Sequence, residues 1–270
     1  MTTFQKIIKF AAIALAILII ASIISTIISI AAGIFDIFDY DEPSYEVGSD
    51  AYEYELDASE ISSLDIELDA ASLTIKRGDA LTVFTNKSRV NVTQNSDVLQ
   101  IEESSSFNKD ECIVTLTIPE LVLEEADIDT GAGILNVRDL CVNILEIDLG
   151  AGESYFDNVT VSESADINGG AGNIEISNCS FASLDFDIGM GNVEISAYLL
   201  GNSDIDCGVG ALDMTLLGKP KDYSIDVNKG IGDFRIGESS VPDGSIVGSG
   251  DNRIKIDSGI GDVNVEFEEQ

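Results

Sequence analysis

Hydrophobic and polar residues alternate with a period of two through much of the second half of the chain, in short runs around pairs of glycines. In one such run Ile128 stands between two aspartates, and Leu135 and Val137 flank an asparagine a few residues later. This alternation is typical of β-strands that bury one face and expose the other. We therefore expect an all-β domain over residues 61–270, with the apolar rows pointing into its core.

A Gly-x-Gly triplet with an apolar middle residue organises the alternation and occurs seven times. Successive triplets begin 19, 20, 19, 19, 22 and 29 residues apart. The two longest intervals contain Lys219-Pro220-Lys221 and a Gly/Ser-rich segment around Pro242, which indicate loop insertions. The first glycines, which define repeats 1 to 7, are Gly131, Gly150, Gly170, Gly189, Gly208, Gly230 and Gly259. The sequence thus predicts rungs of about 19–20 residues, regular over residues 126–270, each with two strands and two turns.

A single rung of this size cannot bury its own apolar face. Ordering each residue costs about 1–2 kcal/mol of backbone entropy, while a buried Ile or Val contributes roughly 1.5–3 kcal/mol. Stacked rungs close a continuous core, so we predict a β-solenoid in which each repeat pairs with its successor. In this arrangement the middle residue of each triplet faces inward and the glycines face outward. The alternative, an antiparallel sandwich or barrel, does not predict one residue class at one offset seven times.

The repeat continues toward the N-terminus in degraded form. Residues 65–75 fit the template with Asp69 and Ala71 in place of the two glycines, and residues 76–125 are less regular and are expected to cap or flank the solenoid. Aligned repeats place Cys141 and Cys179 two rungs apart, roughly 9–10 Å at the spacing of β-strands. A disulfide needs Cα atoms within about 7 Å, so this pair is predicted to be unbridged.

Residues 10–35 form an uncharged stretch rich in Ile, Leu and Ala. About 20 such residues cross a bilayer as a helix. Two lysines precede the stretch and an aspartate follows it, which predicts a single-pass protein of the cell membrane. Residues 1–9 would lie in the cytoplasm and the C-terminal domain outside it. The alternative is a cleaved signal peptide ending near Ala31, although the apolar core of a signal normally has only about 7–15 residues.

The chain is strongly acidic, with a formal net charge of −35. Residues 36–60 carry ten acidic residues and no basic one, which predicts an extended stalk. A field of this sign repels nucleic acid and attracts metal cations and basic proteins or peptides. The chain contains no His, the commonest general base near neutral pH and the commonest zinc ligand. We therefore expect a protein that is not an enzyme and does not bind nucleic acid.

Two columns of acidic side chains are predicted on the outward face, four and two positions before each triplet. Stacking would place neighbouring carboxylates about 4.8 Å apart, where they repel one another. One interpretation is a ladder of weak calcium sites with oxygen ligands; the other is a solvated acidic face screened by diffuse counterions. The candidate ligands are Asp127, Asp129, Asp148, Asp166, Asp185, Asp187, Asp204 and Asp206. No other cofactor is expected.

The run Ala126-Asp127-Ile128-Asp129-Thr130-Gly131-Ala132-Gly133 and its repetition at residues 146–152 resemble the repeat of a bacterial envelope family named "putative adhesin", whose function is largely unknown. The resemblance covers roughly residues 61–270. It implies a β-solenoid behind an N-terminal membrane helix, an association of some members with envelope stress, and no catalytic residues. The degraded early rungs and the two late insertions depart from the commonest repeat.

Three functions are weighed on these grounds. The first is a surface-displayed, adhesin-like interaction module that contacts another envelope protein. The second is an envelope-stress sensor or modulator whose acidic domain captures cationic peptides. The third is a carbohydrate-active enzyme, because elongated β-helices can cleave polysaccharides with two or three clustered carboxylates. Such enzymes need long loops that build a cleft, and most turns here have only a few residues. A chance cluster is the better interpretation of Asp185 and Asp187.

Overall fold

The computed structural model describes residues 51–104 and 112–269. They belong to a compact unit that runs from Val47 to Gln270. The predicted cytoplasmic segment 1–9, the predicted membrane helix 10–35 and the first part of the predicted stalk lie outside the described residues. Within those residues, no helix is long and apolar enough to cross a membrane.

The described residues form one wound sheet of sixteen strands, and two short 3-10 turns lie at Ala58–Glu60 and Pro220–Asp222. The strands are β1 (Tyr52–Glu55), β2 (Ser63–Arg77), β3 (Thr82–Thr85), β4 (Val90–Asn95), β5 (Val98–Glu103), β6 (Cys112–Ile118), β7 (Leu123–Arg138), β8 (Cys141–Asp157), β9 (Thr160–Val209), β10 (Leu212–Leu217), β11 (Tyr223–Ile231), β12 (Phe234–Ile236), β13 (Ser239–Ser240), β14 (Ser245–Gly248), β15 (Asn252–Ile260) and β16 (Val263–Glu268).

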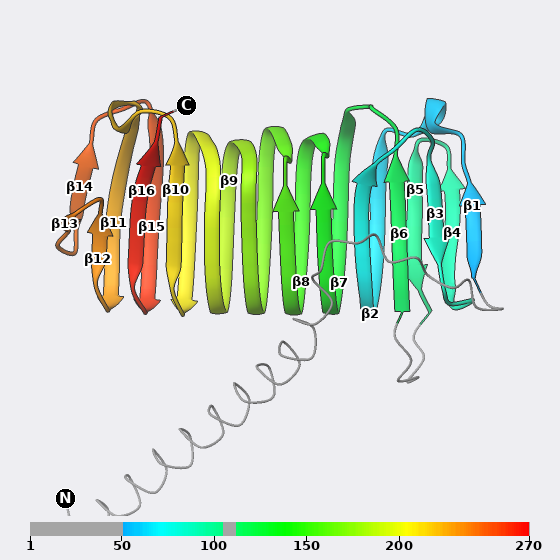
Figure 1. Cartoon of the computed structure of the whole chain (residues 1–270), viewed down its shortest axis with the longest axis horizontal. Coiled ribbons are helices and arrows are strands. Elements are labelled where there is room, and N and C mark those ends of the chain that lie inside the picture. The colour runs from blue at the N-terminus through cyan, green and yellow to red at the C-terminus, as the bar shows by residue number, and fades with distance from the viewer. Residues whose placement is uncertain (1–50, 105–111, 270) are drawn as a thin grey trace, which may run out of the picture. The chain divides into compact units, whose positions relative to one another are not determined.

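The regular part of the domain is a stack of rungs in parallel register. β7 pairs with β8 so that Ile128 lies opposite Ile147, and β8 pairs with β9 so that Ile147 lies opposite Ile167. β9 winds through more than two rungs as one continuous strand (Figure 1). Residues paired across neighbouring rungs are separated in the sequence by the length of one repeat, so the predicted β-solenoid is confirmed.

The apolar row three positions before each triplet lies in the centre of the core. Each of its members is at most 1% exposed. They are Ile128, Ile147, Ile167, Phe186, Ile205, Val227 and Ile256. Because every rung adds one residue to this row, burial continues along the whole stack and makes rungs stable that would be unstable alone.

The chain bends at each triplet, and the bend corrects one prediction. The alternation predicts an inward-facing middle residue, but Val209, Ile260 and Ile231 are 42%, 53% and 73% exposed. The alternation restarts beyond the corner, so the middle residue lies on the outside of the bend. At Gly152, φ is +148°, and a Cβ atom would lie 1.9 Å from the carbonyl oxygen of Gly133 in the adjacent rung. Glycine is needed there because the backbones of stacked corners approach so closely.

The order of the rungs departs from the sequence at the C-terminal end, so the prediction that each repeat pairs with its successor is wrong there. Repeat 5 pairs with repeat 7, with Ile205 opposite Ile256, and repeat 7 pairs with repeat 6, with Ile256 opposite Val227. Figure 1 shows the red strands β15 and β16 between yellow β10 and orange β11 and β12. Repeats 5, 6 and 7 have the same residue pattern, so repeat 7 can pair with repeat 5 as well as repeat 6 could. The two loop insertions make the chain long enough for repeat 6 to occupy the last position and for repeat 7 to return between repeats 5 and 6.

Antiparallel strands cover both ends of the stack. At the C-terminal end β14 pairs with β11 and β13 with β12. At the N-terminal end β5 and β6 form the rung outside β2, β4 pairs with β5, and β3 pairs with β6. β1, from the segment predicted as a stalk, pairs with β3. Strands β3 to β6 therefore contribute the N-terminal cap, and among the described residues the outermost strands at both ends are antiparallel ones, not rungs of the regular stack.

Candidate functional site

Two columns of acidic side chains run along one face of the solenoid, as the repeat predicts. Asp127 lies opposite Glu146 in the outer column, and Asp129 lies opposite Asp148 in the inner one. The outer column, four positions before each triplet, also holds Asp166, Asp185 and Asp204. The inner column, two positions before it, also holds Asp187 and Asp206. All eight candidate residues thus belong to one continuous face, and neighbours within a column are about 4.8 Å apart.

The crowding of the columns shows in their pKa values. Partial burial, together with the charges of Asp166 and Asp204, raises the pKa of Asp185. The pKa of Asp129 is raised by partial burial first and then by its acidic neighbours, including a hydrogen bond with the carboxyl group of Asp148. Each like charge disfavours ionisation of the next. Binding of a cation or a proton therefore stabilises the face, because it reduces the repulsion between the carboxylates.

A shallow groove, open to solvent, follows the inner column along the stack. It is lined by the carboxylates of Glu67, Asp129, Asp148 and Asp187 together with the amide of Asn168. The groove is also lined by Asp69 and by the first glycines of repeats 1 to 4, Gly131, Gly150, Gly170 and Gly189. Because glycines have no side chain, ligand groups can come close to the backbone beside the carboxylates. The groove suits a linear ligand with several positive charges.

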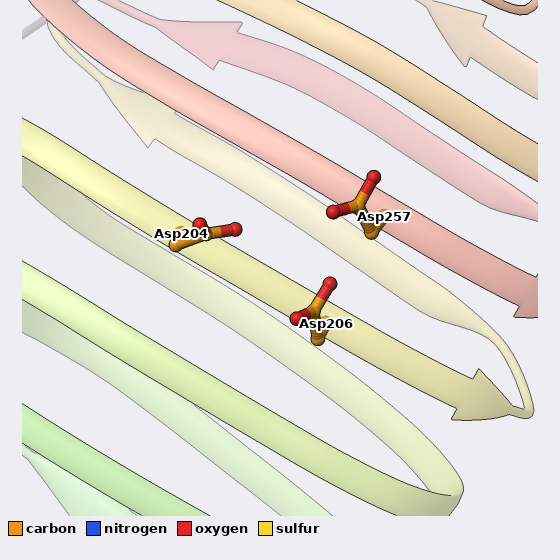
Figure 2. A group of neighbouring side chains, drawn as sticks. All are labelled: Asp204, Asp206 and Asp257. Atoms are coloured by element: carbon orange, nitrogen blue, oxygen red, sulfur yellow. The ribbon is translucent and has the colours of Figure 1, made fainter.

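Among the described residues, one group of three carboxylates is close enough together to hold an ion, and it lies where repeat 7 is inserted beside repeat 5. Figure 2 shows Asp204 and Asp206 on β9 and Asp257 on β15; one carboxylate oxygen of each lies within 4.8 Å of the others. Partial burial opposes the ionisation of Asp257, but hydrogen bonds from Lys255 and Asn228 outweigh it and lower the pKa of Asp257. Partial burial and the charge of Asp257 raise the pKa of Asp206. The site therefore favours a charged Asp257 beside a more readily protonated Asp206.

Lys255 supplies a positive charge to this cluster. Its Nζ atom lies 3.1 Å from Oδ1 of Asp204 and 2.5 Å from Oδ2 of Asp257. Three carboxylates offer oxygen ligands of the kind that calcium prefers, but the ammonium group already neutralises part of their charge. Sequence reasoning did not include Asp257 among the candidates. In the sequence, only the presence of Lys255 in the outer column indicated that this rung is unusual. Its neighbours could not be identified without knowing the order in which the rungs stack.

Sulfur chemistry is not favoured by the surroundings of the cysteines. All four are free thiols, and Cys112, Cys179 and Cys207 are buried. Burial raises the pKa of Cys179 to about 11 and that of Cys207 to about 12. Because the thiolate is the nucleophile, these thiols are poorly reactive. The chemistry available on the described surface is dominated by its carboxylates.

Residues 61–230 and 115–266 each match the Toastrack DUF4097 family. The chain belongs to this family. Together the two matched ranges span the Toastrack solenoid from the first core residue to the last strand, and the predicted relationship to the "putative adhesin" proteins is confirmed. No curated protein matches the chain.

Solved structures similar to this Toastrack domain have adhesin names. A "putative cell adhesion protein" from Clostridium sporogenes is 15% identical, with 81% of this chain and 99% of that chain covered and a TM-score of 0.35. A "putative adhesin" from Bacteroides fragilis is 12% identical, with 82% and 98% covered and a TM-score of 0.39. Neither the family description nor these names denotes an enzyme.

Proposed function

We propose that this Toastrack protein is a non-enzymatic, adhesin-like interaction module of the bacterial envelope whose acidic face binds cationic partners. The observation that carries the proposal is the pair of acidic columns: the outer one has a carboxylate in each successive rung, about 4.8 Å from the next, and the inner one is interrupted by Asn168. Regular columns on a flat sheet face suit multivalent contact with a basic envelope protein or peptide. The charge of the ligand offsets the repulsion that the columns impose on themselves.

The proposal places the solenoid outside the cell membrane, with residues 10–35 as a single membrane anchor. The uncharged run after two lysines supports this orientation. The anchor is tested by fractionating cells that express the full chain. We expect the intact chain to stay with the membranes after a high-pH carbonate wash, and an added protease to reach the solenoid from outside. A shorter chain in the soluble fraction would instead mean a cleaved signal peptide.

Binding is tested by calorimetric titration of the unit 47–270 with oligolysine at low and physiological salt. We expect saturable binding that weakens as salt screens the columns. Replacing Asp148 and Asp187 with Asn should lower the affinity severalfold. The matched control replaces the exposed residues Asp79 and Glu238 with Asn and Gln, which removes the same charge outside the columns. An equal loss in both variants would contradict a specific acidic face.

Calcium is titrated in the same way, because the carboxylate columns remain candidate metal ligands. Saturable calcium binding that is abolished by Asp185→Asn with Asp204→Asn would make the columns a metal site. Heat changes that only follow ionic strength would assign them to a solvated acidic face. Saturable turnover of a glycan by the same unit would overturn the non-enzymatic assignment.

A further inference from the structure

An exposed apolar ridge runs along the corner formed by the triplets at the C-terminal end of the stack. Ile231 lies opposite Ile260, and Ile260 lies opposite Val209, so these middle residues of repeats 6, 7 and 5 form one row. Their exposures rise from 42% at Val209 to 53% at Ile260 and 73% at Ile231. Exposed aliphatic side chains in one contiguous row, rimmed by polar residues, mark interaction sites more often than isolated ones do.

The ridge differs from the same corner in the first repeats. Repeats 1, 2 and 3 have alanine as the middle residue, at Ala132, Ala151 and Ala171, which lie in register with one another. The side chains at this corner thus become larger toward the C-terminal end. The solenoid core does not require large residues here, because they lie outside the bend. The ridge therefore calls for an explanation other than folding.

Carboxylates flank the ridge on both sides. Asp206 and Asp257 precede the triplets of repeats 5 and 7, and Asp233 and Asp262 follow those of repeats 6 and 7. Lys229 lies at the same corner, and its Nζ atom is 3.4 Å from the carbonyl oxygen of Gly232, to which it donates a hydrogen bond. A complementary ligand would present an apolar stripe to the ridge and basic side chains on either side of it.

The spacing of the ridge residues favours a helical ligand. Rungs are about 4.8 Å apart, and one turn of an α-helix rises about 5.4 Å, so a helix lying across the strands presents one apolar residue to each rung. In an extended strand, side chains on one face are about 6.8 Å apart, which fits the spacing of the rungs less well. A second copy of the chain fits poorly, because it would bring two strongly acidic domains together.

We infer that this ridge, formed by Val209, Ile260 and Ile231, docks a cationic amphipathic peptide that binds as an α-helix along the solenoid axis. The inference rests on the proposed function and adds to it the class of cationic partner. The acidic columns attract the ligand, and the apolar ridge selects one whose basic residues flank an apolar stripe. Binding should then depend on the order of residues in the peptide as well as on its charge.

The test uses a designed peptide of about 18 residues with leucines along one helical face and lysines on the others, and a scrambled peptide of identical composition. Both are titrated into the unit 47–270, which contains every core residue of the described chain. We expect the amphipathic peptide to bind about tenfold more tightly, and its advantage to persist at about 0.5 M NaCl, where surface charges are largely screened.

The decisive variant replaces Ile231 and Ile260 with Thr, which keeps the β-branched shape and leaves the core untouched. We expect it to bind the two peptides equally. The matched control is Ile246→Thr, since Ile246 is 69% exposed in β14, away from the ridge; its tenfold preference should remain. A double variant with full preference, or a wild type that binds both peptides equally, overturns the inference while the acidic face stands. If neither peptide binds, the proposed function fails with it.

Discussion

The ammonium group of Lys255 lies 3.1 Å from Oδ1 of Asp204, across the boundary between repeat 7 and repeat 5. In the same column the other repeats carry only Asp or Glu. The one basic residue of the outer column therefore lies at the place where the stacking order departs from the sequence. This contact connects the electrostatics of the acidic face to the unusual topology of the C-terminal end.

Replacing Lys255 with Met should destabilise the domain, because it leaves Asp204 and Asp257 without their cation. The three side chains are 34–46% exposed, so solvent screens the ion pairs and the loss is modest. We expect the midpoint of thermal unfolding to fall by about 1–3 °C, and by less at high salt. Lys219→Met, in an exposed turn, is the control. Equal shifts in the two variants would show that net charge alone matters.

The inserted position of repeat 7 can be tested with a native cysteine. Cys207 on β9 lies opposite Ser258 on β15, about 4.8 Å away between Cα atoms. Because the buried thiol of Cys207 is poorly reactive in the folded domain, the Ser258→Cys variant is refolded under oxidising conditions. It should then form an intramolecular disulfide with Cys207, detected by mass spectrometry after non-reducing digestion. Were the repeats stacked in sequence order, the two residues would be two rungs apart and no bond would form. Thr160→Cys, opposite Cys141 within the regular stack, is the positive control.

The glycine corners should tolerate no side chain. Gly152→Ala places a Cβ atom 1.9 Å from the carbonyl oxygen of Gly133 at a φ of +148°, so both the rung spacing and the backbone must give way. We expect the free energy of unfolding, measured with urea, to fall by about 3 kcal/mol or more. Gly237→Ala is the control, because Gly237 also has a positive φ of +57° but no atom within 4 Å of its Cβ position. It should lose only about 1 kcal/mol. Similar losses would refute the role of close stacking.

Much of the solenoid could be predicted from the sequence because its register follows from a repeated offset. The spacing of the repeats was enough to predict that Asp127 lies opposite Glu146 and that Ile128 is buried, because stacking in register determines both the partner and the face of each residue. The exposure of Val209 could not be predicted, because a period of two holds along a strand but not through a corner. The neighbours of Lys255 could not be predicted either. Repeats 6 and 7 carry the same pattern, so the pattern does not say which of them pairs with repeat 5.

The acidic face should make the domain more stable when the pH falls moderately below neutral. The pKa values of Asp127, Asp129, Glu146, Asp185 and Asp206 are raised in the folded state, with partial burial as the first cause and neighbouring carboxylates next. The folded state then binds more protons than the unfolded chain over the range just above the ordinary carboxyl pKa of about 4. Stability therefore decreases as the pH rises through the raised pKa values.

Only the hydrogen-bonded Asp257 acts against this trend in the two columns, because its pKa is lowered. We expect the unfolding midpoint of the unit 47–270 to be higher at pH 5 than at pH 7, and added NaCl to reduce the difference by screening the columns at pH 7. A variant with Asp129 and Asp148 both changed to Asn should show a smaller pH dependence, because it removes two carboxyl groups that share a hydrogen bond. A midpoint that falls steadily from pH 7 to pH 5 would mean that carboxylates stabilised by hydrogen bonds, as Asp257 is, outweigh the crowded columns.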